Sequence, residues 1–442
     1  MAREGTGEAL LPVLKNQMRS ARTALWLRPA IFSVVAATAA VLLATVDIVL
    51  PSGSLDWLPE VETAAVENLL EVLASGMLTV ATVTLSVHML VLNLAAGQVS
   101  PRAVPEIMAD RVTQNAMGTF LGTFVYALSA LLLLGFEVVA RSGVSLLFLG
   151  ALLMMLNAVR YLVQWIHHVA EILKINHTLH RVHRQAVAVL DAYLADDAPK
   201  SCAEVATPSG EALPLRPCIA GYIELIDGER LHRLACDHDL AVRLLVQEGD
   251  FVHPHRVLMA IHGARPDAAV LDALRGAVVV GFERTHEGDP RFGFELLAEV
   301  ASRALSPGIN DPQSAIACVN YLGSLLAKAG SCPPGRYPAP QTADGRVRYL
   351  RADFAAMLER ALRPIMRDGA GFAEVIDAIL RVLRDLAEEV APDYLDSIVM
   401  EARRAEDLAE GGLQLAVDKK AIHAVAREVR EAAARRGVSA AQ

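Results

Sequence analysis

The sequence predicts an α-helical polytopic membrane protein with four transmembrane helices, joined to a cytoplasmic α+β domain. Hydrophobic residues make up 53% of the 442-residue chain and its mean hydropathy is +0.35, yet charged residues still account for 21%. Apolar segments of bilayer length, which requires about 20 residues, lie only in the N-terminal part of the chain. The composition therefore indicates a membrane part followed by a water-soluble part.

Charge and cysteine usage exclude several classes of protein. The net charge is −9 and the deficit is spread along the chain, so the sequence has no polybasic face for nucleic acid. The five cysteines are scattered without a C-x-x-C pair, which argues against a disulfide framework and a zinc ribbon. We expect neither a metal site nor a cofactor.

The four expected spans are 29–50, 70–96, 116–140 and 144–166. They form a transmembrane domain over 29–166, preceded by an interfacial N-terminal helix over 1–28. The first span is too long for the apolar region of a signal peptide, which has about 7–15 residues. We therefore expect it to remain as an anchor.

Lys and Arg flank these spans on one side of the membrane. On that side lie Arg3, Lys15, Arg19, Arg22, Arg28, Arg102, Arg111, Lys174, Arg181 and Arg184. The opposite side offers Arg141 and collects Asp56, Glu60, Glu62 and Glu67. The positive-inside rule then places both termini in the cytoplasm.

The second span carries a polar stripe. At 100° per residue, a narrow sector of the helix holds Ser75, Thr79, Thr82, Ser86 and Asn93, and Glu71 extends it toward the acidic outer loop. Two interpretations remain open. The hydroxyls could bond across the helix bundle or back to their own carbonyl groups, or the stripe could line a wetted path through an oligomer.

The third span contains Gly118-x-x-x-Gly122, a spacing that allows close approach of another helix. We expect this surface to pack against the second span.

Beyond the membrane domain, we expect a helical extension over 167–195 and a linker over 196–216. A small β domain follows over 217–262. Its pattern of a strand, Gly249-Asp-Phe-Val252 and a second strand is similar to half of a barrel-sandwich hybrid domain, although the carrier lysine of such domains is absent. The remainder, 263–442, reads as a helical domain.

Polar residues gather around an interruption in this helical domain. The candidates for a ligand or subunit contact are Arg284, Arg303, Ser306, Asn310 and Asp311. Helix capping alone also explains Ser306, Asp311 and the following Pro312. No nucleophile–base pair or phosphate-binding loop accompanies them, so we expect no enzymatic activity.

Several stretches together resemble a bacterial family of predicted membrane proteins, domain of unknown function 2254. They are the second span continuing into Ala96-Gly-Gln98-Val-Ser-Pro101-Arg102, the block from Gly221 through Asp227 to Gly249-Asp-Phe-Val252, and Arg303-Ala-Leu-Ser-Pro-Gly-Ile-Asn-Asp-Pro312. Gly122-Thr-Phe-Val-Tyr126 and Trp165-Ile-His-His168 also resemble that family. The resemblance covers nearly the whole chain and implies a fold and a bacterial inner-membrane location, without a chemistry.

The sequence thus favours a homo-oligomeric ion-conducting pore in the lipid bilayer, with helix 71–93 along the path and a cytoplasmic regulatory domain. Inorganic ions and further copies of the chain are the expected partners, and nucleic acid is not. The alternative is a non-conducting, membrane-anchored sensor or scaffold that binds a ligand or partner through the 303–312 loop.

Overall fold

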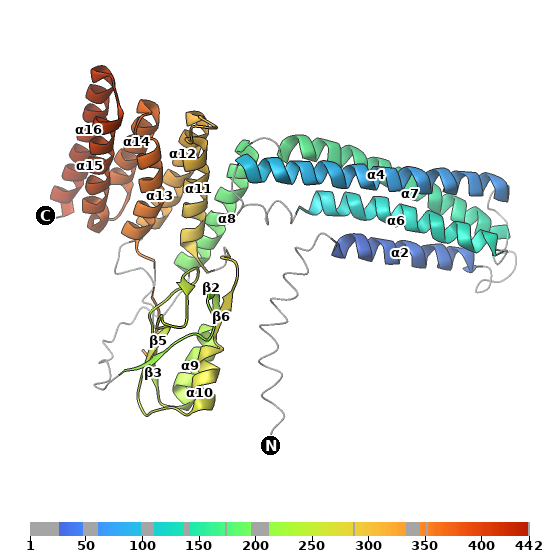
Figure 1. Cartoon of the computed structure of the whole chain (residues 1–442), viewed down its shortest axis with the longest axis horizontal. Helices are drawn as coiled ribbons and strands as arrows, with labels where there is room; N and C mark the ends of the chain where they lie inside the picture. The colour runs from blue at the N-terminus through green and yellow to red at the C-terminus, as the bar shows by residue number, and fades with distance from the viewer. Residues whose placement is uncertain are drawn as a thin grey trace. The chain divides into compact units, whose positions relative to one another are not determined.

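The computed structural model describes residues 26–46, 61–98, 110–136, 139, 141–172, 175–195, 212–285, 288–332, 345–350 and 352–440. The chain divides into two compact units, Met1–His177 and Thr178–Gln442 (Figure 1). The N-terminal helix expected over 1–28 and most of the linker expected over 196–216 lie outside the described residues.

The first unit contains four helices long and apolar enough to cross a membrane, which confirms that part of the sequence prediction. They are α2 (Leu27–Ala44), α4 (Thr63–Gln98), α6 (Arg111–Gly135) and α7 (Arg141–Ile172). Helices α4 and α7 extend beyond the expected spans, because polar and charged residues at their ends continue the helical backbone past the apolar segment.

Helix α6 has the largest share of buried residues of the four helices. Tyr126 lies fully buried, and its hydroxyl donates to the Leu147 carbonyl oxygen of α7 at 3.0 Å. The Gly118-x-x-x-Gly122 surface packs against α2: a Cβ at Gly122 would lie 3.3 Å from the Phe32 carbonyl oxygen. The expectation that this surface packs against the second span is therefore wrong, because the ring and backbone of Phe32 occupy the space above both glycines.

The second unit begins within α8 (Ile175–Ala195) and continues into a region of two small sheets. One sheet has the strand order β1-β5-β3-β7 and the other β4-β2-β6. The strands are β1 (Leu213–Leu215), β2 (Gly221–Ile226), β3 (Ala241–Leu244), β4 (Phe251–Val252), β5 (Met259–His262), β6 (Val278–Gly281) and β7 (Val347–Arg348). All strand pairs are antiparallel except β3–β7.

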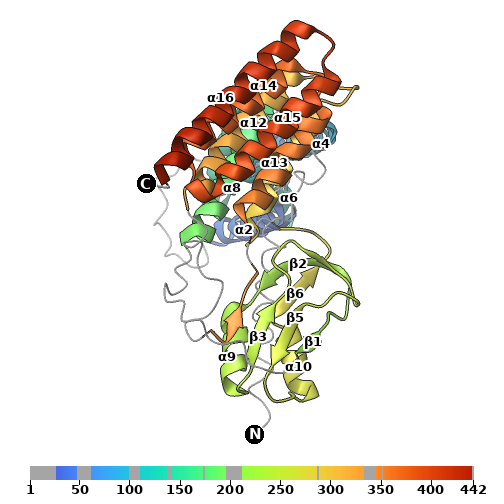
Figure 2. The same cartoon turned by 90° about the vertical axis from the view of Figure 1, so that its left-hand side faces the viewer.

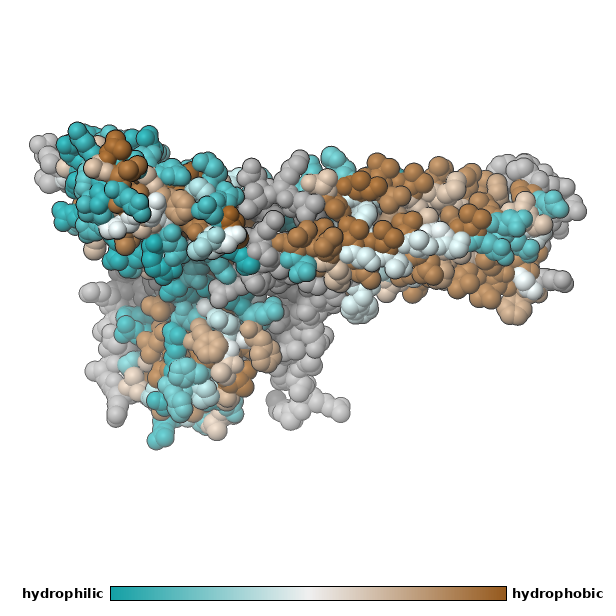
Figure 3. Space-filling model, turned by 45° about the horizontal axis from the view of Figure 1, so that its top comes forward, coloured by the Kyte–Doolittle hydropathy of each residue, from teal (hydrophilic) through white to brown (hydrophobic). Residues whose placement is uncertain are grey.

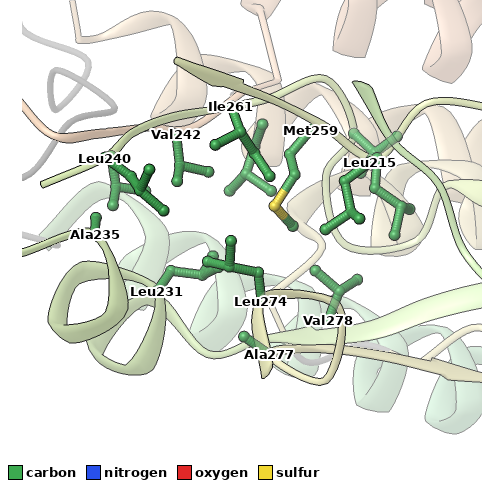
Figure 4. Packing of buried hydrophobic residues seen from close by; sticks show 14 of the residues in the cluster. Leu215, Leu231, Ala235, Leu240, Val242, Met259, Ile261, Leu274, Ala277 and Val278 are labelled. Atoms are coloured by element: carbon green, nitrogen blue, oxygen red, sulfur yellow. The ribbon is translucent and has the colours of Figure 1, made fainter. Parts of the chain in front are cut away.

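A hydrophobic core joins these sheets to two short helices, α9 (Gly228–Asp237) and α10 (Ala268–Arg275). Figure 4 shows Leu231 of α9 and Leu274 of α10 facing Met259 and Ile261 of β5. Strand β6 belongs to this region although it lies beyond residue 262, the expected end of the β domain, and its Val278 packs into the same core.

The rest of the second unit is helical (Figure 2). Its helices are α11 (Pro290–Ala304), α12 (Pro312–Gly330), α13 (Phe354–Asp368), α14 (Ala373–Glu389), α15 (Leu395–Gly412) and α16 (Ala416–Ala440). Apolar residues recur at helical spacing in α12 to α16, and each of these helices buries the face that carries them, whereas α11 is buried nearly all round. A buried charge also joins two of these helices: Glu401 of α15, 2% exposed, accepts from Arg363 Nη2 of α13 at 2.7 Å.

Candidate functional site

The polar stripe of α4 lies on the outer surface of the membrane unit. Its members are all exposed in the single chain: Glu71, Ser75, Thr79, Thr82, Ser86 and Asn93. The residues beside the stripe are exposed as well and apolar, among them Leu78, Met89 and Leu90. Figure 3 shows a mostly brown membrane unit with a paler band running along it.

The hydroxyl groups of the stripe donate to carbonyl oxygens of their own helix. Thr79 Oγ1 lies 2.9 Å from the Ser75 oxygen, Thr82 Oγ1 2.9 Å from that of Leu78, and Ser86 Oγ 2.9 Å from that of Thr82. Ser75 Oγ lies 3.2 Å from the Val72 oxygen. Hydroxyls within a bundle can bond across it or back to the carbonyl groups of their own helix. These four hydroxyls of α4 bond to their own helix.

This bonding pattern has a chemical consequence for the stripe. A hydroxyl has one proton to donate and two lone pairs that accept. Because each proton points at an α4 carbonyl, the oxygen lone pairs remain to face outward. The stripe therefore offers oxygen atoms, which attract cations and the hydrogens of water.

The other face of α4 is buried and also polar. Thr84 and His88 lie there, each 1% exposed. Asp110, which caps α6, and His168 of α7 lie close enough to act on the charge of His88. Sequence spacing does not indicate that Asp110 and His168 belong together, because 58 residues separate them and no short motif links an N-cap to a residue on another helix.

In the second unit, Arg284 belongs to a buried ionic cluster. Its Nε donates to Asp289 Oδ2 at 2.8 Å, and its guanidinium also pairs with Glu295. Arg291 Nε donates to Asp289 Oδ1 at 2.9 Å, while its Nη1 lies 3.0 Å from Asp250 Oδ1. Because Asp250 belongs to the sheet region and Asp289 caps α11, this cluster joins the sheets to the helices.

The cluster favours the charged form of Glu295. Burial disfavours the charged form of Glu295, but hydrogen bonds and charge attraction from Arg284 and Arg360 outweigh that effect, so the pKa of Glu295 lies below its ordinary value. Asp289, 1% exposed, receives hydrogen bonds from two arginines. The arrangement therefore fits a structural joint between the two parts of this unit better than an open ligand site.

The neighbouring loop shows the capping geometry expected from sequence. Asp311 accepts from the Ser314 hydroxyl at 2.5 Å and from the Ser314 backbone nitrogen at 3.1 Å, and these two bonds lower the pKa of Asp311. Ser306 Oγ donates to the Arg303 carbonyl oxygen at 2.6 Å. Asn310 takes a left-handed backbone conformation with φ +52°. Ser306 thus lies just past the end of α11, and Asp311 caps the start of α12. Ligand binding by this loop stays a prediction.

The structure does not bring all five of these candidates together. Arg284 pairs with Asp289 and Glu295, and no hydrogen bond or ion pair in the described part of the second unit joins it to the 303–311 segment. Within the described ranges, no group of three or more His, Cys, Asp or Glu side chains is arranged to hold a metal ion.

The chain has relatives among mycobacterial proteins. It is 26% identical over 334 residues to the uncharacterized protein Rv1290c of Mycobacterium tuberculosis, and equally to the uncharacterized protein Mb1321c of Mycobacterium bovis. These alignments cover 73% of the chain and 63% of each relative, so the chain spans less than two thirds of their length. No solved structure matches it.

A family model covers residues 22–385, a stretch that includes all four apolar helices, both sheets and the ionic cluster. The chain therefore belongs to the family described as predicted membrane protein (DUF2254).

Proposed function

We propose that this membrane protein assembles into a homo-oligomeric pore that conducts cations, with the polar stripe of α4 along the path. The observation that carries the proposal is the exposure of six polar residues on one face of a single apolar span. Ionisable and amide side chains within a span almost always face protein or water, because lipid offers them no partner.

Glu71 and Asn93 make the strongest case against a stripe that faces lipid. Serine and threonine hydroxyls bonded to their own helix can be tolerated in hydrocarbon, since their protons are satisfied. Ionisable and amide side chains within a span rarely face hydrocarbon. Both Glu71 and Asn93 are exposed in the single chain, so a surface formed with other copies, or water, accounts for them best.

The stripe's chemistry favours cations over anions. The hydroxyl oxygens present lone pairs, since their protons are bonded to α4 carbonyls. Glu71 adds negative charge near one end of the path, as acidic rings do in cation channels. Because one chain presents the stripe on its outside, the path has to form between copies.

The distribution of Lys and Arg supports a location in the bacterial inner membrane, with both termini in the cytoplasm. The second unit, 178–442, would then be cytoplasmic and would assemble or regulate the pore. The likeness of its sheet region to half of a barrel-sandwich hybrid domain stays a prediction. We propose no enzymatic activity.

The alternative is a non-conducting sensor or scaffold that binds a ligand or partner through the 303–312 loop. The observation in its favour is that Ile309, an apolar side chain, is 43% exposed beside the left-handed Asn310. An exposed apolar residue on a turn between two helices is suited to a contact surface.

Ion flux into liposomes that contain the purified full-length chain tests the pore. We expect Thr82→Leu with Ser86→Leu to abolish K⁺ flux while the oligomer persists, because both oxygens are replaced by branched carbon. The matched control is Thr38→Leu: Thr38 is also exposed and donates to its own helix, Oγ1 to the Val34 oxygen at 2.8 Å, but it lies on α2. Equal flux through the stripe variant and the wild type would contradict the proposal.

A further inference from the structure

A cluster of buried polar side chains lies at one end of the membrane unit. Asp110 caps α6, where its carboxylate accepts from the backbone nitrogens of Val112 at 3.2 Å and Thr113 at 3.0 Å. Its Oδ2 also lies 2.8 Å from His168 Nε2 on α7. Asp110 is 7% exposed and the His168 side chain 15% exposed.

Helix α4 supplies a second imidazole to the same place. His88 is 1% exposed, and both Asp110 and His168 act on its charge. Among the described residues, no hydrogen-bond partner reaches His88 Nε2, nor the hydroxyl of Thr84 one turn earlier on the same helix. A carboxylate and two imidazoles from three helices therefore lie near enough in the interior of the unit for their charges to interact.

A further buried polar atom from the same three helices has no partner among the described residues. It is Trp165 Nε1 of α7, which lies one turn before His168. Leaving a buried donor or acceptor unpaired costs about 1–3 kcal/mol. Ordered water usually satisfies such atoms, since each water molecule makes about three hydrogen bonds.

We propose that His88, Asp110 and His168 form a buried, hydrated proton-binding site inside the membrane unit. A proton delivered by water binds the free nitrogen lone pair of His88, and the imidazolium that forms is held by the Asp110 carboxylate. His168 already uses this carboxylate, so the two imidazoles compete for its negative charge. This inference rests on the membrane unit alone and is independent of the proposed pore.

The other ionisable groups on these helices lie outside the site. Arg111 of α6 and Arg160 of α7 are exposed, and Arg160 lies over the Tyr161 ring. His167 pairs with Glu171 on the surface of α7. On α4, Glu67 and Glu71 lie at least four turns before His88, with Glu62 just ahead of the helix.

Helix α2 packs against α6 and α7, and its Arg28 donates to Asn115 Oδ1 at 2.7 Å. No other charged side chain lies on the described part of α2. Among the described residues, Asp110 and His168 are therefore the two ionisable groups that act on the charge of His88.

The site has a direct spectroscopic test. The full-length chain in nanodiscs, labelled with ¹⁵N-histidine, is titrated between about pH 4 and pH 9, and the His88 signal is assigned by its loss in His88→Gln. We expect the His88 signal to titrate in the wild type. Asp110→Asn should weaken proton binding by His88 about tenfold or more, because an opposite charge nearby shifts such an equilibrium by that amount.

Asparagine caps helices as well as aspartate does, so Asp110→Asn removes the charge and keeps the helix start. His168→Gln should have the opposite effect and strengthen proton binding by His88, since it removes the competing imidazole. Loss of folding cannot produce shifts of opposite sign in two variants. His167→Gln, at the exposed neighbour whose side chain is 79% exposed, is the matched control and should leave the titration unchanged.

A His88 signal that does not move over this pH range would overturn the proposal and leave a water-filled polar cavity. The same conclusion follows if the His88 titration is identical in the wild type and both variants.

Discussion

Gly249 lies where the sheet region meets the ionic cluster, and replacing it with alanine tests that joint. Its φ is +80°, a left-handed conformation. A Cβ there would lie 2.7 Å from Arg284 Nε and even closer to the Asp289 carboxylate, well inside van der Waals contact. Gly249→Ala must therefore displace the carboxylate that both arginines share.

The magnitude follows from two contributions. A left-handed backbone costs alanine about 1–2 kcal/mol. Breaking a buried ion pair by displacing one partner costs about 3–5 kcal/mol. Because the displaced carboxylate can recover part of its bonding, the two costs do not add fully, and we expect a total of about 3–5 kcal/mol. Since 1.4 kcal/mol corresponds to tenfold, local opening of the joint should become at least about a hundredfold more frequent.

Hydrogen–deuterium exchange of the full-length chain in detergent measures this opening peptide by peptide. Peptides that cover Glu248–Val252 and Asp289–Glu295 should exchange faster in Gly249→Ala, while those of the membrane helices should not change. Gly308→Ala is the control, because no atom lies within 4 Å of a Cβ built there. Unchanged exchange at both sites in Gly249→Ala would refute the role of this glycine.

Three further predictions concern helix packing. Glu401→Gln should destabilise the α13–α15 contact by about 2 kcal/mol, read from local exchange, because Arg363 loses a charged acceptor. A hydrogen bond to a glutamate of α15 raises the pKa of His423, so the stability it contributes is complete below about pH 6.5 and is lost as pH rises through the raised value. The effect should be a few tenths of a kcal/mol, since the side chain is 48% exposed, and exchange of α16 should lose this pH dependence in His423→Gln. Gly122→Leu should lower the melting temperature of the membrane unit by crowding α2, whereas Gly76→Leu, where a Cβ would meet nothing within 4 Å, should not.

Local chemistry explains why the larger elements could be predicted from sequence. Hydropathy alone places the four apolar helices, since a span needs about 20 apolar residues whatever its neighbours are. The same holds for the restart of a helix at Asp311 and Pro312, because an N-cap bonds to a residue three positions away.

Contacts between distant segments could not be predicted in this way. The Gly118-x-x-x-Gly122 spacing predicts that another helix packs closely here, but the neighbouring sequence does not indicate whether that helix is α2 or α4. The polar stripe shows the same limit: its 100° periodicity defines a face, while the packing of α6 and α7 decides that the opposite face, with His88, is buried.

The ionic cluster that joins the sheets to the helices in the second unit could not be predicted from sequence spacing either. Gly249-Asp250 reads as a turn between strands, and Asp289 reads as a helix cap. Their shared function appears only when Arg291, 41 residues beyond Asp250, spans both carboxylates.

The measurement that tests the central claim most directly is the mass of the intact protein in nanodiscs, by native mass spectrometry. The polar stripe of α4 lies on the outside of one chain, so a path along it requires several copies around an axis. We predict a closed ring of three or more chains. A monomer, or a dimer, would contradict the pore and leave the sensor or scaffold as the better account.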